Sequence, residues 1–354
     1  MQEVLDEWRP MVDTALESLL PRSIDEEYLR TYFGPSSYCY DTDAIQHALS
    51  DPVWELLDRG GKRWRPVVCL LFIDGFGGDP EHHVDYACIP EILHNGTIIV
   101  DDVEDGAEMR RGAPALHHVY GVDVALNAGN AMYFLPLKVI GHDPAGLSPE
   151  TKLALYDMLM YELNRTHLGQ GMDICWHNQP GVGIEELHYL EMCACKTGCL
   201  GRMVARIAAI LTDQPDDVEE AAAAYAEDMS IAFQIGDDLL DIEHTLDRAG
   251  DFGKAFGNDI REGKKTLMVI HATEHASSED ASRLAEILAS EENDRTEILE
   301  AIDIMRDTDS LTYARERAQG FARQARDHLE DANLTQDRHA DLAAFADFVI
   351  ERDA

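Results

Sequence analysis

An apolar helical run in the first third of the chain leads directly into three aspartates, Asp101, Asp102 and Asp105. At 3.6 residues per turn, the first and last of these carboxylates lie on the same helix face. Close carboxylates repel one another, and apolar surroundings raise that cost. Bound Mg²⁺ would offset it, because this ion takes carboxylate and phosphate oxygens as ligands. Arg110 and Arg111 follow, and guanidinium groups suit phosphate oxygens. The stretch therefore predicts a site for Mg²⁺ and a diphosphate.

The same spacing of aspartates occurs at the end of a second apolar run, where Asp237, Asp238 and Asp241 repeat the i, i+1, i+4 pattern. We expect the two aspartate triads to face each other across one cavity. A third acidic string, residues 216–220, follows Pro215 in a polar segment. Its composition is typical of the charged first turn of a helix. We interpret this third string as a solvated helix start, and so as a decoy.

Several motifs, taken in order, carry a resemblance to a known family. They are GGKRWRP at 60–66, DDVED at 101–105, RRG at 110–112, GQGMD at 169–173, KTG at 196–198, FQIGDDLLD at 233–241 and KAFGNDIREGKKT at 254–266. With these motifs the chain resembles the trans-type isoprenyl diphosphate synthases, the polyprenyl synthetase family, and within it the archaeal geranylgeranyl or farnesylgeranyl type. The closing FVIERD at 348–353 is similar to the family's C-terminal end.

The resemblance implies a fold and a reaction. The fold would be all-α, an isoprenoid-synthase-type helical bundle with the active site in a central cavity, formed by one domain over residues 1–354. The reaction would be head-to-tail condensation of isopentenyl diphosphate with an allylic diphosphate. The implied cofactor is Mg²⁺, as three ions once diphosphate is bound. The family is typically homodimeric, so a homodimer is expected here.

The resemblance also assigns residues, by matching positions in the motifs. Those expected to bind isopentenyl diphosphate are Lys62, Arg65, His94 and Arg111. Those expected to act in catalysis are Asp101, Asp102, Asp105, Arg110, Lys196, Thr197, Gln234, Asp237, Lys254 and Lys264. The expected metal ligands are Asp101, Asp102, Asp105, Asp237, Asp238 and Asp241. Gln170 and Asp173 match the family's GQxxD motif. A structural role remains the alternative for His94, on an apolar helix, and for this polar pair at a helix end.

Product length should depend on the pocket floor one helical turn below the first triad, at Gly96 and Thr97. Members resembling farnesyl diphosphate synthases carry bulky aromatic residues there, so these small residues predict an open floor. Tyr133 and Phe134 on the next helix are candidates for a later stop. We therefore expect a product of twenty or twenty-five carbons, with a longer polyprenyl chain as the alternative.

Composition excludes some partners. The formal net charge of −39 and the isoelectric point near 4.5 argue against nucleic acid or an anionic membrane surface as a partner. Only seven of the 29 basic residues are lysines, and five of these lie in the motifs above. An acidic, lysine-poor surface suits concentrated salt, which screens charge repulsion. We therefore expect a halophilic archaeal source.

Cysteine usage and hydropathy indicate a cytoplasmic protein. The seven cysteines are an odd number, and Cys193, Cys195 and Cys199 lack the spacing of a common zinc site, so we interpret them as buried free thiols. No signal peptide or apolar run of about 20 residues, the length that crosses a bilayer, is present.

Two other function classes use related features. Terpene cyclases and head-to-head condensing enzymes share aspartate-rich helices and Mg²⁺, but they do not need the basic motif GGKRWRP at 60–66. A catalytically silent partner subunit should have lost one aspartate triad, whereas this sequence keeps both. Both alternatives are therefore weaker than the synthase.

Overall fold

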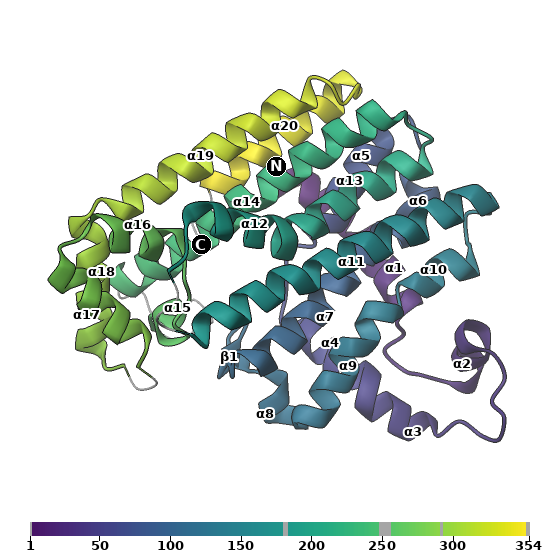
Figure 1. Cartoon of the computed structure of the whole chain (residues 1–354). Helices are drawn as coiled ribbons and strands as arrows, with labels where there is room; N and C mark the ends of the chain where they lie inside the picture. The colour runs from purple at the N-terminus through teal and green to yellow at the C-terminus, as the bar shows by residue number, and fades with distance from the viewer. Residues whose placement is uncertain (1, 180–182, 248–255, 291–292, 352–354) are drawn as a thin grey trace. The chain divides into compact units, whose positions relative to one another are not determined.

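The computed structural model describes residues 2–179, 183–247, 256–290 and 293–351 (Figure 1). The elements before residue 145 are α1 (Gln2–Leu19), α2 (Glu26–Phe33), α3 (Thr42–Ile45), the π-helical turn η1 (Gln46–Ser50), α4 (Asp51–Asp58), α5 (Trp64–Gly75), α6 (Pro80–Ala87), α7 (Ile89–Glu104), β1 (Met109–Arg110), β2 (Ala113–Pro114), α8 (Leu116–Tyr120), α9 (Val122–Phe134) and α10 (Leu137–His142). The later elements are α11 (Pro149–His177), α12 (Glu186–Cys193), the π-helical turn η2 (Ala194–Gly198), α13 (Cys199–Leu211), α14 (Asp216–Asp247), α15 (Asn258–Arg261), α16 (Leu267–His275), α17 (Ser278–Leu288), α18 (Arg295–Asp307), α19 (Ser310–Leu329) and α20 (Gln336–Glu351).

The all-α prediction is confirmed, and the described residues form two compact units. Unit 1 comprises residues 1–159, 203–219 and 334–342, and unit 2 comprises residues 160–202, 220–333 and 343–354. Only β1 and β2 are strands in the part of the chain that the structure describes. No helix among the described residues is long and apolar enough to cross a membrane.

In unit 1, α7 and α9 lie side by side because each has a glycine at the contact (Figure 1). A Cβ atom added to Gly96 would lie 2.7 Å from Cβ of Met132 and 2.9 Å from the carbonyl oxygen of Gly129. A Cβ atom on Gly129 would lie 2.8 Å from Val100. No side chain fits at such distances, so the two glycines set the spacing of these helices.

Unit 1 also contains a tight hairpin that the sequence did not indicate. Strands β1 and β2 pair antiparallel, with Arg110 opposite Ala113. The two residues between them, Arg111 and Gly112, both have positive φ values, 53° and 75°. A two-residue loop with positive φ at both positions matches the right-handed twist of the flanking strands. The RRG motif is therefore the end of a strand followed by a turn.

Unit 2 has its own apolar core, to which α12, α14 and α16–α19 contribute. Its fully buried members include Tyr189 and the aliphatic side chains of Ile235, Ile298 and Ile302. Between α12 and α13 the chain forms the π-helical turn η2. A turn of this kind holds one residue more than an α-helical turn and often marks a functional site.

The structure confirms the interpretation of the third acidic string. The decoy acidic string begins α14, where Asp216 and Asp217 are exposed in its first turn. Their carboxylates suit the positive end of the helix dipole, which accounts for this string without a metal.

Candidate functional site

The first aspartate triad lies at the carboxyl end of α7, in unit 1. Gly106, with φ of 63°, stops the helix, and the amide of Ala107 donates to the carbonyl of Asp102 at 2.9 Å. This is the glycine-terminated ending that satisfies the last helix carbonyls. Asp101 and Asp105 are half-buried, whereas Asp102 is only 2% exposed. The triad therefore has two more accessible carboxylates and one buried carboxylate.

Asp102 is held by the first arginine of the RRG motif. The guanidinium of Arg110 donates to its Oδ1 through Nε at 2.8 Å and also through Nη2. Burial raises the pKa of the Asp102 carboxyl, and the positive charge of Arg110 opposes that rise. Arg110 thus connects the hairpin to the end of α7, so the two motifs that sequence reasoning paired are in direct contact.

Basic residues surround His94, two turns before the first triad. Burial holds the pKa of His94 well below its usual value, and the positive charges of Arg65, Arg111 and Arg110 lower it further. Arg65 is buried, and its guanidinium lies 4.3 Å from the centre of the Trp64 ring. A neutral histidine among guanidinium groups can donate one N–H to an anion without adding charge.

Lys62 and Arg111 meet at the short segment 60–62, to which Lys62 belongs and to which Arg111 is hydrogen-bonded. Lys62 is exposed and follows Gly60 and Gly61, whose φ values are 105° and 141°. Arg111 donates through Nη1 to the carbonyl of Gly60 at 2.6 Å. Burial lowers the pKa of Arg111 to about 10, so it remains charged at neutral pH. Unit 1 therefore gathers the four residues expected to bind isopentenyl diphosphate around the start of α5 and the hairpin.

Two of the four expected chain-length positions need correction. Gly96 is buried against α9, with no room for a Cβ atom. A glycine is therefore present because the two helices are in close contact, and it does not leave an open pocket floor. Phe134 is 67% exposed in unit 1, so it does not line the interior of that unit. Thr97 is half-buried, and its hydroxyl donates to the carbonyl of His94 at 2.8 Å. Tyr133 is 9% exposed. Burial raises the pKa of its hydroxyl, and the negative charges of Glu104 and Asp101 raise it further.

In unit 2, the KTG motif occupies the π-helical turn η2. Lys196 Nζ lies 2.7 Å from Oδ2 of Asp173, so the GQGMD and KTG motifs meet through an ion pair. A Cβ atom on Gly169 would lie 2.5 Å from the backbone nitrogen of Lys196. The glycine of GQGMD is therefore needed for the close approach of α11 to this turn. The adjacent Thr197 donates through its hydroxyl to Oε1 of Gln234 at 2.9 Å.

The second triad lies inside α14 and differs from the first. Asp237 is half-buried, while Asp238 and Asp241 are 6% and 3% exposed. Asp238 accepts hydrogen bonds from the hydroxyl of Tyr189 at 2.8 Å and from Nε2 of Gln234 at 2.9 Å. Burial and the nearby Asp259 carboxylate raise the pKa of the Asp238 carboxyl.

The third aspartate of the second triad anchors α15. Oδ2 of Asp241 accepts the backbone N–H of Asp259 at 3.2 Å. Lys264, just beyond α15, lies 2.6 Å from Glu262 and 3.6 Å from Asp259. Lys254, the other lysine expected to act on diphosphate, lies outside the described residues.

The carboxylates are not gathered into a ready-made metal centre. Within the described ranges, no three His, Cys, Asp or Glu side chains are arranged to hold a metal ion by themselves. Mg²⁺ commonly binds through one or two carboxylates together with substrate phosphates. The half-buried carboxylates of Asp101 and Asp105 in unit 1, and of Asp237 in unit 2, carry oxygens of the type that this ion prefers.

Comparison with known proteins identifies the class. The sequence model of a family described as polyprenyl synthetase matches residues 46–305, which is most of the chain. A geranylgeranyl pyrophosphate synthase of Geoglobus acetivorans is 36% identical over 84% of this chain and 88% of its own length. This chain therefore belongs to the polyprenyl synthetase family, and the enzyme is a prenyltransferase.

Further relatives agree in sequence and in fold. A geranylfarnesyl diphosphate synthase of Natronomonas pharaonis is 31% identical over 84% of this chain and 88% of its own length. The crystal structure of a geranylgeranyl pyrophosphate synthetase from Pyrococcus horikoshii matches with a TM-score of 0.83 and 28% identity, over 99% of both chains. The predicted fold of an isoprenoid synthase is thereby confirmed.

Sequence reasoning missed several residues that shape the site. Tyr189 donates to Asp238 across a separation of 49 residues, and no local pattern marks it. Glu91 and Asn95, one turn apart on α7, are buried polar residues in an otherwise apolar stretch. That contrast between polar type and apolar surroundings was a usable signal, because buried polar groups need partners.

Proposed function

We propose that the enzyme condenses isopentenyl diphosphate with an allylic diphosphate, head to tail, to give geranylgeranyl or a longer isoprenyl diphosphate. The observation that carries this proposal is the presence of two aspartate triads at helical positions together with a cluster of guanidinium groups around His94. The relatives named as geranylgeranyl and geranylfarnesyl diphosphate synthases support the product range.

The first triad and the second triad are proposed to bind Mg²⁺ with the allylic diphosphate. Asp101, Asp105 and Asp237 are the favoured ligands because they are half-buried. Asp102 and Asp238, which are buried and accept hydrogen bonds from Arg110 and Tyr189, would hold α7 and α14 in position more than they bind the ion. When bound, Mg²⁺ supplies neutralisation of the charge that develops on the leaving diphosphate. The number of ions, expected to be three, belongs to this proposal.

The basic residues of unit 1 are proposed to bind isopentenyl diphosphate. Lys62, Arg65 and Arg111 would bind its diphosphate oxygens, and His94 would donate one hydrogen bond as a neutral imidazole. Holding the diphosphate fixes the double bond of the substrate against the allylic carbon, which removes an entropic part of the barrier.

The residues of unit 2 are proposed to act on the allylic substrate. Lys196 and Lys264 would donate to its diphosphate, as would Arg110 from unit 1 and Lys254, and Thr197 and Gln234 would offer lone pairs to the developing cation. The C–O bond of the allylic diphosphate breaks, the freed carbon bonds to the terminal carbon of isopentenyl diphosphate, and a neighbouring proton leaves. The departing diphosphate is proposed to accept that proton, because none of the described residues assigned above is an evident general base.

Thr97 and Tyr133 are proposed to influence product length. Thr97 lies one turn before the first triad, and Tyr133 is buried on the adjacent helix α9.

The chain is also proposed to act as one domain, in the cytoplasm of a halophile, and as a homodimer. Exposed Leu153, Met160 and Leu168 lie along one face of α11 and would suit a subunit interface.

The proposed activity is tested by an assay in molar KCl with Mg²⁺, labelled isopentenyl diphosphate and each allylic primer in turn. Products are dephosphorylated and sized by chromatography. We expect a discrete product of twenty or twenty-five carbons, and its formation should stop when a chelator removes Mg²⁺. A ladder of much longer products would favour the alternative of a longer polyprenyl chain, and no incorporation by folded protein would contradict the activity.

A further inference from the structure

Unit 1 contains a chain of hydrogen-bonded polar side chains that ends at Arg111. Its other three members, Arg63, Glu91 and Asn95, have no part in the proposed reaction. Glu91 Oε1 accepts hydrogen bonds from Nη1 of Arg63 at 3.2 Å and from Nδ2 of Asn95 at 3.1 Å. Oδ1 of Asn95 accepts in turn from Nη2 of Arg111 at 3.2 Å. We call these four residues the Arg63–Arg111 relay. Arg63, Glu91 and Asn95 are 7%, 3% and 0% exposed.

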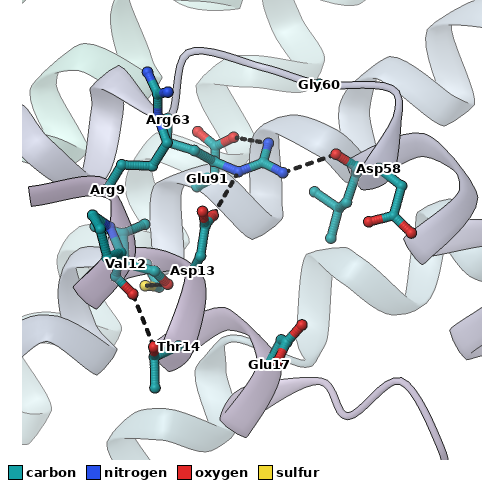
Figure 2. Close-up of polar contacts among 12 residues, drawn as sticks. Arg9, Val12, Asp13, Thr14, Glu17, Asp58, Gly60, Arg63 and Glu91 are labelled. Carbon is teal, nitrogen blue, oxygen red and sulfur yellow. Dashed lines mark hydrogen bonds and ion pairs between the residues drawn. The ribbon is translucent and has the colours of Figure 1, made fainter. Parts of the chain in front are cut away.

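Such burial is costly unless every partner is in place. Removing one partner of a buried ion pair leaves an uncompensated charge, which destabilises the folded protein strongly. Figure 2 shows Arg63 between Glu91 and Asp13, whose Oδ1 lies 3.5 Å from Nε of Arg63. A buried ion pair is weak evidence for stability by itself, and its better-attested use is to fix one particular arrangement. The question is therefore what the Arg63–Arg111 relay fixes.

The arginines at both ends of the relay donate hydrogen bonds to the backbone of residues 56–60. Arg63 donates through Nη2 to the carbonyl of Leu57 at 3.0 Å. Arg111 donates through Nη1 to the carbonyls of Leu56 at 3.0 Å and Gly60 at 2.6 Å. The first two carbonyls belong to the last turn of α4, where helix carbonyls lack partners within the helix. The two guanidinium groups therefore cap α4 and hold the segment that leads to Lys62.

The backbone of both arginines is in an uncommon conformation. Arg63 has a φ of 50° and Arg111 a φ of 53°, in the left-handed region that residues other than glycine rarely adopt. Strain of this kind persists only where the surroundings over-determine the conformation, and it often occurs at ligand sites. The hydrogen bonds of the relay hold both arginines in this conformation.

We propose that Glu91 and Asn95 are positioning residues that set the guanidinium of Arg111 and the 60–62 backbone for the diphosphate of isopentenyl diphosphate. Neither residue touches the substrate in this account. This inference rests on the proposed assignment of Lys62, Arg65 and Arg111 to that diphosphate. A merely structural relay would instead support the fold of unit 1 without favouring one substrate over the other.

The test compares Michaelis constants for the two substrates in the variant Asn95→Leu, which removes the acceptor for Arg111 without changing charge. We expect KM for isopentenyl diphosphate to rise about tenfold, as for the loss of one hydrogen bond to a charged group. KM for the allylic substrate and kcat should change less than about twofold. Glu91→Gln keeps an oxygen acceptor for Arg63 and should show a smaller shift of the same selectivity, which decides the matter if Asn95→Leu does not fold.

Asp74→Asn is the matched control. It weakens the ion pair of Asp74 with Arg338 at the last turn of α5, the helix whose first turn follows Arg63. It should change thermal stability without a selective change in either KM. Equal shifts in both KM values, or a loss of stability alone, in both Asn95→Leu and Glu91→Gln would overturn the inference. Lys62→Ala tests the substrate assignment separately from the relay. If it leaves KM for isopentenyl diphosphate unchanged, the assignment of this substrate to the region fails, and not the relay alone.

Discussion

The two aspartate triads have the same spacing but different surroundings. In both, the middle residue is buried, with Asp102 held by the guanidinium of Arg110 and Asp238 by the hydroxyl of Tyr189. The last residue differs, since it is half-buried at the end of α7 but 3% exposed in α14, where it is Asp241. One triad thus keeps two half-buried carboxylates and the other keeps one.

The difference follows from where each helix ends. Helix α7 ends at Glu104, so Asp105 stands at its cap. Helix α14 continues to Asp247, six residues beyond Asp241. Asp241 therefore stays buried, and its carboxylate accepts a hydrogen bond from the backbone N–H of Asp259. The same spacing of aspartates therefore supplies different numbers of accessible carboxylates, and the point at which each helix ends accounts for the difference.

The largest expected effect comes from the first residue of each triad, which is half-buried in both. We predict that Asp101→Ala or Asp237→Ala lowers kcat by roughly 10³-fold or more, because each removes a ligand for the ion that stabilises the leaving group. Circular dichroism should show an intact fold. Asp217→Ala, at the exposed start of α14, is the control and should leave kcat unchanged. Near-normal turnover in either triad variant would falsify the equivalence of the two first residues.

The partners of the middle residues should differ in importance. Arg110→Met leaves the buried Asp102 without its ionic partner and should cost about 3–5 kcal/mol of unfolding free energy. Tyr189→Phe removes a neutral donor to Asp238 and should cost about 1–3 kcal/mol. Urea unfolding measures both. Equal losses of unfolding free energy would contradict the expected difference between the ionic and the neutral partner.

The last residues of the triads should separate activity from stability. Asp105→Ala is expected to lower kcat by roughly tenfold to a hundredfold with little change in Tm, because Asp105 is half-buried and lies at the proposed metal site. Asp241→Ala removes the acceptor for the backbone of α15 and should lower Tm by roughly 2–8 °C. Differential scanning calorimetry and the product assay together distinguish these outcomes. The reverse pattern would contradict the assignment by helix length.

The smallest effect on rate, but a clear effect on product, is expected one turn before each triad. Helix α7 has Thr97 at this position, whereas α14 has Phe233. Thr97→Phe gives both helices a phenylalanine and should shorten the product while changing kcat by less than about threefold, because the new ring fills space below the first triad. Chromatography of the dephosphorylated product checks this. Thr97→Ser is the control, and an unchanged product from Thr97→Phe would remove Thr97 from the pocket floor.

The sequence predicted what is local and missed what depends on packing. Helix type, the ends of apolar runs and the exposed decoy at Asp216 follow from periodicity and charge within a few residues. Gly96 shows the limit, because a missing side chain leaves either open space or a close contact with another helix. Only the fold, which places Met132 against it, decides between the two. The exposure of Phe134 and the bond from Tyr189 to Asp238 depend on the fold in the same way.

The π-helical turn at Ala194–Gly198 fixes the length of the chain at this point. Because this turn holds one residue more than an α-helical turn, deleting one residue from it would restore an α-helical turn and leave the helix beyond in the same phase. Arg202, which donates to Glu162 through Nε at 2.8 Å, would keep its direction. Lys196 and Thr197, which lie inside the turn, would not keep theirs, so such a deletion should cost activity more than stability. A designer who wishes to alter Lys196 or Thr197 must change residue type and keep residue number.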